Sequence, residues 1–467
     1  MSLTPLEPWI AQKTATPSAL TPLTNDDRRP TKVDEAFDLR PSPLAPRPSL
    51  SQSALDAHQL ACLRATLALA RSRSAFYRRL LGDAVDVNAL AELARLPFTT
   101  ADDVRADPLA FVCVSQDDIQ RVVTLDSSGT TGAPKRLYFT RADQELTIDF
   151  FAAGMSTFTG PGDRVLILLP GETPGSVGDL LATGLHRIGA VPIKHGPVRD
   201  AALTREVAIR EAATVIVGVP THLLRLVRTA PPGAPVPPVH SVLLSTDHVP
   251  QAIVKAIETA WGCRVYNHYG MTEMGLGGGV DCVARRGYHL READLLFEVV
   301  DPLTGAVLPD GEQGEVVFTT LTRVGMPLIR YRTGDYGRWI TKPCPCGTAL
   351  RTLAHITTRI TGPVDLGGGV RLAQPELDEA LFAIDGVLNF ATVAQTPPGG
   401  SHLTVALQIT SLADPIRVQT SAQAALWALP AIATTPQLSL DLRVTTEAVT
   451  APTLAKRAIR LNPPGGE

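Results

Sequence analysis

The strongest chemical signal in the sequence is the segment DSSGTTGAPK, residues 126–135, which directly follows the β-rich run VVTL. Gly129 and Gly132 allow positive φ and close backbone approach, so consecutive N–H groups can point at one anion. Lys135 adds a mobile positive charge for terminal phosphates. Further donors are the hydroxyls of Ser127, Ser128, Thr130 and Thr131. The GxxxxGK[ST] spacing of a Walker A loop is absent, and the hydroxyl density disfavours a simple exposed turn, so we interpret the segment as another kind of phosphate-binding loop.

A second group of residues has the types that bind a metal. Cys344 and Cys346 form a C-P-C-G knuckle, and Cys282 and His289 lie upstream in DCVARRGYH. Three thiols and an imidazole match the ligand set of a structural tetrahedral zinc site. The C-x-C spacing is tighter than the usual C-x₂-C. We favour structural Zn²⁺, with reduced, unliganded thiols as the alternative.

Three further segments follow the loop in chain order. They are YNHYGMTEMG at 266–275, PLIRYRTGD at 327–335, and AKRAI, which contains Lys456. With the loop, they resemble the signatures of the acyl-adenylate-forming superfamily, which includes acyl-coenzyme A synthetases, adenylation domains and luciferase-like enzymes. The segments LARLPFTTADDVR, GYHLREADLLFEVVDP and CPCG narrow the resemblance to phenylacetate–coenzyme A ligase-like proteins. The resemblance extends from about Leu55 to Ile459.

This resemblance implies ATP-dependent activation of a carboxylic acid to acyl-AMP, with release of pyrophosphate. Glu273 would hold Mg²⁺, with Thr272 beside it in the same catalytic motif. Asp335 would accept hydrogen bonds from the ribose hydroxyls, although a turn-forming aspartate is the alternative. Lys456 would bridge the carboxylate and the α-phosphate in the adenylation transition state.

The remaining nucleotide contacts are weaker expectations. Tyr269, which precedes Gly270, would stack on adenine, with core packing as a nearly equal alternative. Arg332 or Arg330 would add charge near the α-phosphate, and either could equally be a strand surface residue. Arg359 matches the arginine of the family hinge.

The resemblance also suggests an aryl or arylacetic acid as substrate. The expected pocket wall is His268, Met271, Met274 and the loop at 172–176. His268 would contact a polar group of the substrate, although a hydrogen-bonded structural histidine is an equal alternative. Phe150 and Phe151 are expected in a helix or a core, with no site role.

The acceptor of the acyl group is predicted to be coenzyme A. The sequence departs here from the family hinge, because no Asp pair follows Arg359 and three glycines stand at 367–369. We therefore keep two alternatives: transfer to a carrier-protein thiol or release of acyl-AMP, and a nucleotide-binding regulatory protein that has lost catalysis. The intact loop, Glu273, Asp335 and Lys456 argue against the second.

Alternating strands and helices must position these residues. Short β-rich runs between 122 and 246 alternate with helical patterns around 143–156, 179–188 and 202–212, which favours a parallel sheet covered on both faces. After Tyr269 the pattern changes to hairpin-like strands. We predict an α/β fold: an extended arm at 1–52, a large adenylation domain at 53–357 with a β-rich subdomain, and a small, mobile α+β domain at 358–467.

Composition limits the remaining function classes. The 467 residues carry 43 Lys+Arg and 46 Asp+Glu, a net charge of −3. This balance argues against nucleic acid as a partner. Six cysteines do not make a disulfide scaffold. No apolar run is long enough for a membrane span, and the N-terminus lacks a signal-peptide core, so we expect a cytoplasmic protein, with a homodimer left open.

Overall fold

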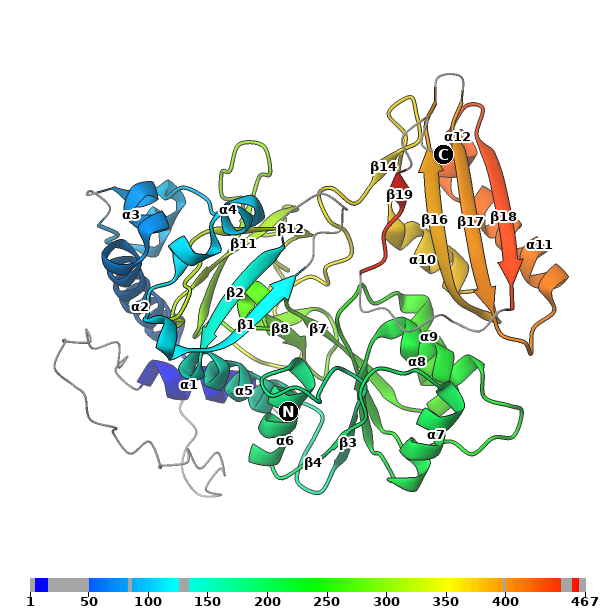
Figure 1. The fold of residues 1–467 in the computed structure, drawn as a ribbon, viewed down its shortest axis with the longest axis horizontal. Helices are drawn as coiled ribbons and strands as arrows, with labels where there is room; N and C mark the ends of the chain where they lie inside the picture. Colours follow the sequence, from blue (N-terminus) through cyan, green and yellow to red (C-terminus); the bar gives the residue numbers. More distant parts are fainter. Residues whose placement is uncertain are drawn as a thin grey trace.

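The computed structural model describes residues 5–15, 50–82, 86–125, 134–397, 400–446 and 456–461 (Figure 1). The expected phosphate-binding residues Ser127, Ser128, Gly129, Thr130, Thr131 and Gly132 lie outside the described residues. Lys135 and Lys456 lie within them.

An eight-stranded sheet in the order β13-β9-β8-β7-β6-β5-β3-β4 is the main support of the fold. Five of its strands are parallel: β7 Arg264–Tyr269, β6 Ser241–Leu244, β5 Val215–Gly218, β3 Arg164–Ile167 and β4 Val191–Lys194. The helices between them are α6 Val177–Arg187, α7 Ala201–Arg210, α8 Pro220–Arg228 and α9 Gln251–Trp261, and α5 Arg141–Met155 precedes them. Because β6 and β7 are parallel neighbours, the loops after them open at the same edge.

The predicted alternation implied that the run VVTL would be a strand of this sheet. It is not. It belongs to β1 Ile119–Leu125, which pairs antiparallel with β2 Lys135–Thr140 in a sheet of two strands. The connection between them is too short for the helical crossover that a parallel pair needs. The expected phosphate-binding loop is therefore the connection of a hairpin, and Lys135 is the first residue of its second strand.

The hairpin-like strands after Tyr269 are confirmed. Strands β8 Gly279–Asp281, β9 Tyr288–Leu290 and β13 Thr352–Leu353 extend the main sheet antiparallel. A separate antiparallel sheet is formed by β10 Leu295–Val300, β11 Gly314–Thr320 and β12 Tyr331–Gly337. The segment YNHYGMTEMG thus begins in β7 and runs past its end, and the segment PLIRYRTGD runs into β12.

The first described residues are not extended, although the sequence predicted an extended arm. They form α1 Leu6–Ala15, in which Leu6 and Ile10 are fully buried. The Lys13 ammonium bonds the Asp294 carboxylate at 3.1 Å, and Glu7 accepts a hydrogen bond from the amide of Ala349. Apolar residues on one helical face explain the docking. The other helices of this region are α2 Gln52–Arg73, α3 Ala75–Leu81, α4 Ala101–Ala106, η1 Leu90–Arg95, η2 Pro108–Phe111 and η3 Gln116–Asp118.

The C-terminal part has its own sheet, in the order β18-β17-β16-β19 (Figure 1). Its strands are β16 Val387–Gln395, β17 His402–Ile409, β18 Ser439–Thr445 and β19 Arg460–Leu461, preceded by the pair β14 Val364–Asp365 and β15 Arg371–Leu372. Its helices are α10 Gln374–Phe382, α11 Pro415–Trp427 and α12 Pro430–Thr434. We call residues 360–461 the small domain and the preceding residues the large domain.

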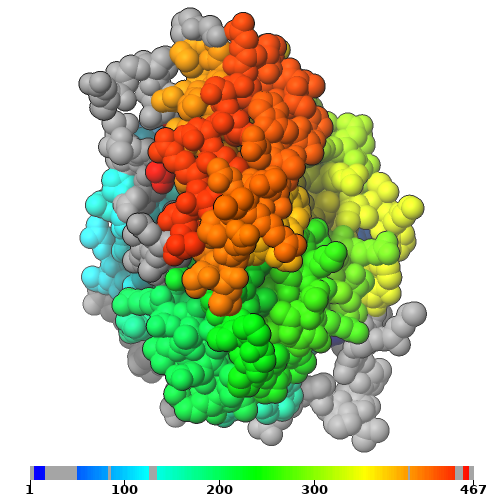
Figure 2. All heavy atoms as spheres, turned by 90° about the vertical axis from the view of Figure 1, so that its right-hand side faces the viewer, coloured from blue at the N-terminus to red at the C-terminus, as the bar shows by residue number. Residues whose placement is uncertain are grey.

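Figure 2 shows the small domain seated directly on the large domain. One buried apolar cluster continues across this contact and includes Leu224 of α8 and Phe390 of β16. The sheets and the helices that flank them confirm the predicted α/β fold class. Within the described ranges, no helix has the length and apolarity needed to cross a membrane.

Candidate functional site

A cleft lies where the two domains meet, at the edge where the loops after β6 and β7 open. Large-domain residues on its wall include Thr246–Val249, Asn267–Gly270, Tyr288, Asp335 and Ile356–Arg359. Small-domain residues include Ala373–Pro375, Asp378 and Lys456–Ala458. The fold therefore brings four expected site residues, Tyr269, Asp335, Arg359 and Lys456, to one cleft from four separate segments.

Asp335 is fixed at the floor of this cleft by two donors. The Tyr269 hydroxyl donates to Oδ2 at 3.0 Å, and the Arg359 guanidinium lies 3.1 Å from Oδ1. Burial and the adjacent Asp335 carboxylate raise the pKa of Tyr269 well above its usual value, so its hydroxyl stays a donor. Because each Asp335 oxygen has a fixed partner, the carboxylate plane is set, and lone pairs remain for further donors such as the two hydroxyls of a ribose.

Gly334 permits this arrangement. Its φ is +73°, and a Cβ at this position would lie 3.1 Å from Nη2 of Arg359. The same guanidinium nitrogen donates to the carbonyl of Thr333 at 2.7 Å. A side chain at residue 334 would strain the backbone and displace Arg359, which explains the glycine before the aspartate in YRTGD.

A buried triangle of polar groups lies at the start of β2. The Lys135 ammonium pairs with the Glu273 carboxylate on η4 Thr272–Met274, and the Tyr331 hydroxyl donates to the same Glu273 oxygen at 3.0 Å. Burial raises the pKa of Glu273, but the Lys135 charge and the hydrogen bonds from Lys135 and Tyr331 together lower it overall. An ionised, nearly buried carboxylate is a hard oxygen ligand suited to Mg²⁺.

A second, apolar cavity lies next to the cleft, with His268 in the walls of both. Its wall consists of Phe150, Phe151, Gly154, Met155, Leu169, Val177, Leu181, Val217, Leu243, Ser245, His268, Leu276 and Val280. His268 also lines the cleft, so the two spaces share this residue. Its Nδ1 lies 2.9 Å from the Ser245 hydroxyl, whereas Nε2 is buried without a partner. Burial lowers the pKa of His268 to about 4, so the ring is neutral near pH 7.

Several sequence expectations for this pocket are not met. Met274 is buried in another core with Phe297, and neither it nor Met271 lines the apolar cavity. The loop at 172–176 does not line it either. Conversely, Phe150 and Phe151 line the cavity, although the sequence offered no reason to distinguish them from core phenylalanines. Their helix, α5, packs beside α6, and the cavity lies between these helices and strands of the main sheet.

Arg332 and Arg330 also lie away from the cleft. Arg332 is paired with Glu315 of the neighbouring strand, and its guanidinium donates to the carbonyl of Pro302 at 2.7 Å. Arg330 is buried against Glu298, with its Nε 3.0 Å from a carboxylate oxygen. Both arginines are thus paired with carboxylates and neither lines the cleft, so the structure gives no support to the expected α-phosphate contact by Arg332. Thr272 and Gly270 remain beside Glu273 and Tyr269, as the motif requires.

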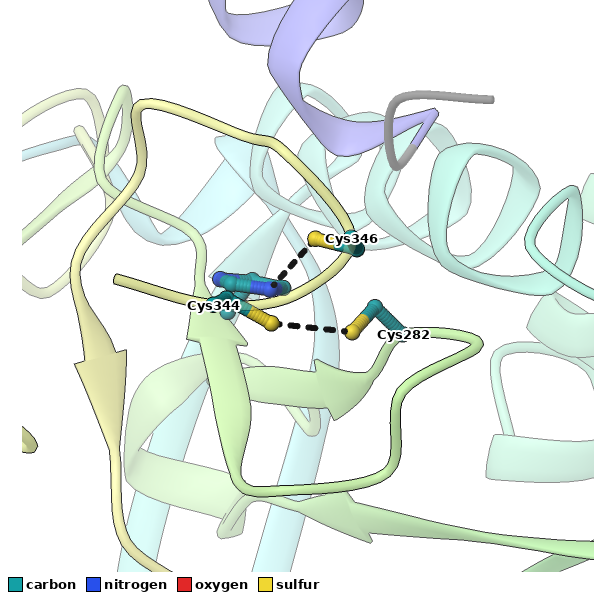
Figure 3. A group of neighbouring side chains, drawn as sticks. Cys282, Cys344 and Cys346 are labelled. Carbon is teal, nitrogen blue, oxygen red and sulfur yellow. Dashed lines mark hydrogen bonds between the residues drawn. The ribbon is translucent and has the colours of Figure 1, made fainter. Parts of the chain in front are cut away.

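The predicted zinc ligands converge (Figure 3). The ligand atoms of Cys282, His289, Cys344 and Cys346 all lie within 4.8 Å of one another. Cys282 Sγ lies 3.5 Å from Cys344 Sγ, and Cys346 Sγ lies 3.4 Å from Nε2 of His289. The other ring nitrogen of His289, Nδ1, lies 3.2 Å from the Arg351 carbonyl. This contact favours the tautomer that leaves Nε2 with a lone pair, as a metal-binding histidine needs.

Comparison with known proteins identifies the family. Residues 56–322 match the family described as AMP-binding enzyme. A phenylacetate-coenzyme A ligase of Thermus thermophilus is 32% identical over 358 residues, which cover 73% of this chain and 78% of that protein. The chain belongs to the AMP-binding enzyme family. This confirms the resemblance to adenylate-forming enzymes of the phenylacetate–coenzyme A ligase-like branch and the prediction of an AMP-forming ligase.

Solved structures show that this AMP-binding enzyme shares its fold with a two-domain ligase. A 2-hydroxyisobutyryl-CoA ligase in the postadenylation state, 20% identical, superposes with a TM-score of 0.72 over 89% of this chain and 91% of that chain. In the thioesterification state the TM-score is 0.61, at 21% identity and over the same shares of the two chains.

Proposed function

We propose that this AMP-binding enzyme activates a carboxylic acid with ATP to give acyl-AMP and pyrophosphate, and then transfers the acyl group to coenzyme A. One observation carries the proposal: the cleft that holds Asp335 and Lys456 shares the wall residue His268 with an adjacent apolar cavity. This arrangement suits a nucleotide in the cleft and an acid whose carboxylate reaches the α-phosphate. The names of the relatives support both steps.

The described residues would divide the work of adenylation as follows. Asp335, held by Tyr269 and Arg359, would bind the ribose hydroxyls and set the position of the α-phosphate. Lys456 would neutralise the charge that develops as the acid oxygen attacks. Lys135 would pair with the terminal phosphates, and Glu273 would hold the metal ion that binds them. Mg²⁺, held by Glu273, would supply charge neutralisation for the leaving pyrophosphate.

The apolar cavity supports an aryl or arylacetic acid as substrate. Phe150, Phe151 and Leu181 offer no charged partner, so a second carboxylate or an ammonium group in this space would lose its hydration without compensation. Aromatic walls favour a flat apolar group. A phenyl group with its carboxylate directed past His268 into the cleft meets these conditions.

We also propose that Cys282, His289, Cys344 and Cys346 hold a structural Zn²⁺. The ion would tie the C-P-C-G loop to β9 and to the residue after β8. Burial lowers the pKa of His289 and keeps its ring neutral, as a ligand requires. Metal analysis of the purified protein should find about one zinc per chain, and Cys344→Ser should lose it.

The test of the two-step function is product analysis. Purified protein with ATP, Mg²⁺, phenylacetate and coenzyme A should form AMP and an acyl-coenzyme A thioester. Omitting coenzyme A should leave acyl-AMP bound and stop AMP release. AMP release with a carrier protein but not with free coenzyme A would show that the acceptor is a carrier-protein thiol. The absence of acyl-AMP with every acid would refute the proposed activity.

A further inference from the structure

The residue after Lys456 is buried where the two domains meet, although it lies near the C-terminal end of the described chain. The Arg457 side chain is only 12% exposed. The segment at 456–461 leads into β19, which pairs parallel with β16 at Val393 and Ala394. In the view of Figure 1, the chain before β19 descends toward the large domain. Lys456 and Arg457 are thus presented at the end of the small sheet that faces the cleft.

Arg457 binds one carboxylate from each domain. Its Nη1 and Nη2 donate to the two oxygens of Asp378 on α10, at 2.8 and 2.9 Å. Its Nε donates to Oδ2 of Asp247 in the large domain at 3.1 Å. The Asp378 side chain is fully buried, and that of Asp247 is 11% exposed. The guanidinium also lies over the Phe382 ring, 4.7 Å from its centroid.

The two contacts differ in what they constrain. Asp378 belongs to the same domain as Arg457, so their two-pronged contact survives any rigid movement of the small domain. Asp247 follows β6 of the large domain, so its contact exists only when the domains are arranged as they are here. Planar, bidentate guanidinium pairs hold a defined geometry, which a lysine at position 457 could not reproduce.

The large-domain partner is itself held in a constrained turn. Thr246, the residue before Asp247, has φ of +82°, in the region that residues with a Cβ avoid. The other oxygen of Asp247 accepts the backbone N–H of His248 at 2.8 Å. This turn lines the cleft. Strain of this kind persists where the surrounding structure fixes it, so Asp247 is presented to Arg457 in one orientation.

We propose that Arg457 is a positioning residue for adenylation: by bridging Asp378 and Asp247 it holds the neighbouring Lys456 at the cleft. The proposal rests on the function proposed above, in which Lys456 acts on the α-phosphate. Other contacts dock the small domain, such as Glu379 accepting the amides of Gln251 and Ala252 at the start of α9. The Arg457 bridge differs from them because it acts directly beside Lys456.

The bridge should matter for one half-reaction only. Formation of acyl-AMP needs Lys456 at the phosphates, so loss of the Asp247 contact should slow it. Conversion of acyl-AMP that is supplied ready-made involves no phosphate transfer. A rotation of the small domain that admits the thiol would break the Asp247 contact and keep the Asp378 contact, so the second step should not depend on Asp247.

The experiment measures the two half-reactions separately in the full chain. Acyl-AMP formation is followed by pyrophosphate release with phenylacetate, and thioester formation by adding phenylacetyl-AMP and coenzyme A. Asp247→Ala should slow the first about 10- to 100-fold, the scale of a small misplacement of a reacting group. It should leave the second within about twofold. Arg460→Gln, an exposed arginine three residues further along, is the matched control and should change neither.

A double-mutant cycle separates positioning from folding. Arg457→Gln leaves the buried Asp378 with the Gln374 amide but without the guanidinium, which will lower stability. Its effect is therefore compared with that of the double variant Arg457→Gln/Asp247→Ala. If the bridge acts as one unit, the double variant forms acyl-AMP no more slowly than Arg457→Gln alone. Equal loss in both half-reactions for Asp247→Ala, or no loss, would overturn the proposal. A wild-type protein without pyrophosphate release would refute the proposed function instead.

Discussion

Replacing Tyr269 by phenylalanine tests how Asp335 is prepared for the nucleotide. The change removes one hydroxyl, which donates to Asp335 Oδ2 at 3.0 Å in a buried setting. A hydrogen bond to a charged group contributes roughly 1.5–3 kcal/mol. At about 1.4 kcal/mol per factor of ten, that range corresponds to about 10- to 150-fold in affinity. Because Arg359 still holds Oδ1, we expect the lower end, an increase of about 10-fold in the KM for ATP.

The assay is steady-state acyl-AMP formation with ATP varied at saturating acid. A ribose contact is made equally before and during the reaction, so kcat should stay within about threefold. Tyr77→Phe is the control, because that buried hydroxyl accepts the Ile329 amide at 2.8 Å in a part of the large domain away from the cleft. It should lower the melting temperature without changing the KM. An unchanged KM for ATP in Tyr269→Phe would refute the role given to Asp335 and Tyr269.

The remaining predictions concern the lysine, the first helix and the metal. Lys456→Ala should abolish acyl-AMP formation and spare ATP binding measured by calorimetry; full adenylation in this variant would exclude the assignment. Burial raises the pKa of Asp294, but Lys13 and Arg291 outweigh it and lower the pKa to about 2. The unfolded pKa is near 3.9, so this carboxylate contributes about 2 kcal/mol of stability above pH 4, which is lost as the pH falls toward 2. Denaturant unfolding at pH 6 and pH 3 should show that loss, and Asp294→Asn should remove its share of the difference. Removing zinc with a chelator should lower the melting temperature of the wild type and leave Cys346→Ser unaffected; equal shifts in both would count against the metal site.

The residues with polar chemistry and regular spacing could be located from the sequence. Asp335 and Tyr269 could be singled out because a glycine and a fixed sequence pattern surround each of them, and both line the cleft. The hydrogen bond between them was not predicted. The ligand set Cys282, His289, Cys344 and Cys346 could be assembled because thiols are rare in this chain, and the structure brings all four together.

The apolar cavity and the charge partners could not be predicted in this way. Phe150 and Phe151 resemble core residues, because a helix face that packs and a helix face that lines a cavity have the same local pattern. Arg332 resembled a phosphate ligand because its partner, Glu315, lies on the neighbouring strand and is distant in sequence. The contacts of Arg457 could not be predicted for the same reason, since both of its carboxylate partners are more than 70 residues away in the sequence.

Helix α1 shows a third limit of prediction from the sequence. Leu6, Trp9 and Ile10 are too few to predict a stable helix alone, and the surrounding proline-rich sequence favoured an extended arm. Helix α1 is stabilised by its contacts with the large domain, through the buried Leu6 and Ile10 and the Lys13–Asp294 pair. Short helices depend on tertiary packing more than on propensity, so sequence patterns identify them poorly.

ATP–pyrophosphate exchange across a panel of carboxylic acids measures the proposed adenylation step directly. Exchange should depend on the added acid, be strongest with aryl and arylacetic acids, and disappear in Lys456→Ala. Exchange at background level with every acid in the panel, by a folded protein, would contradict the proposed activity.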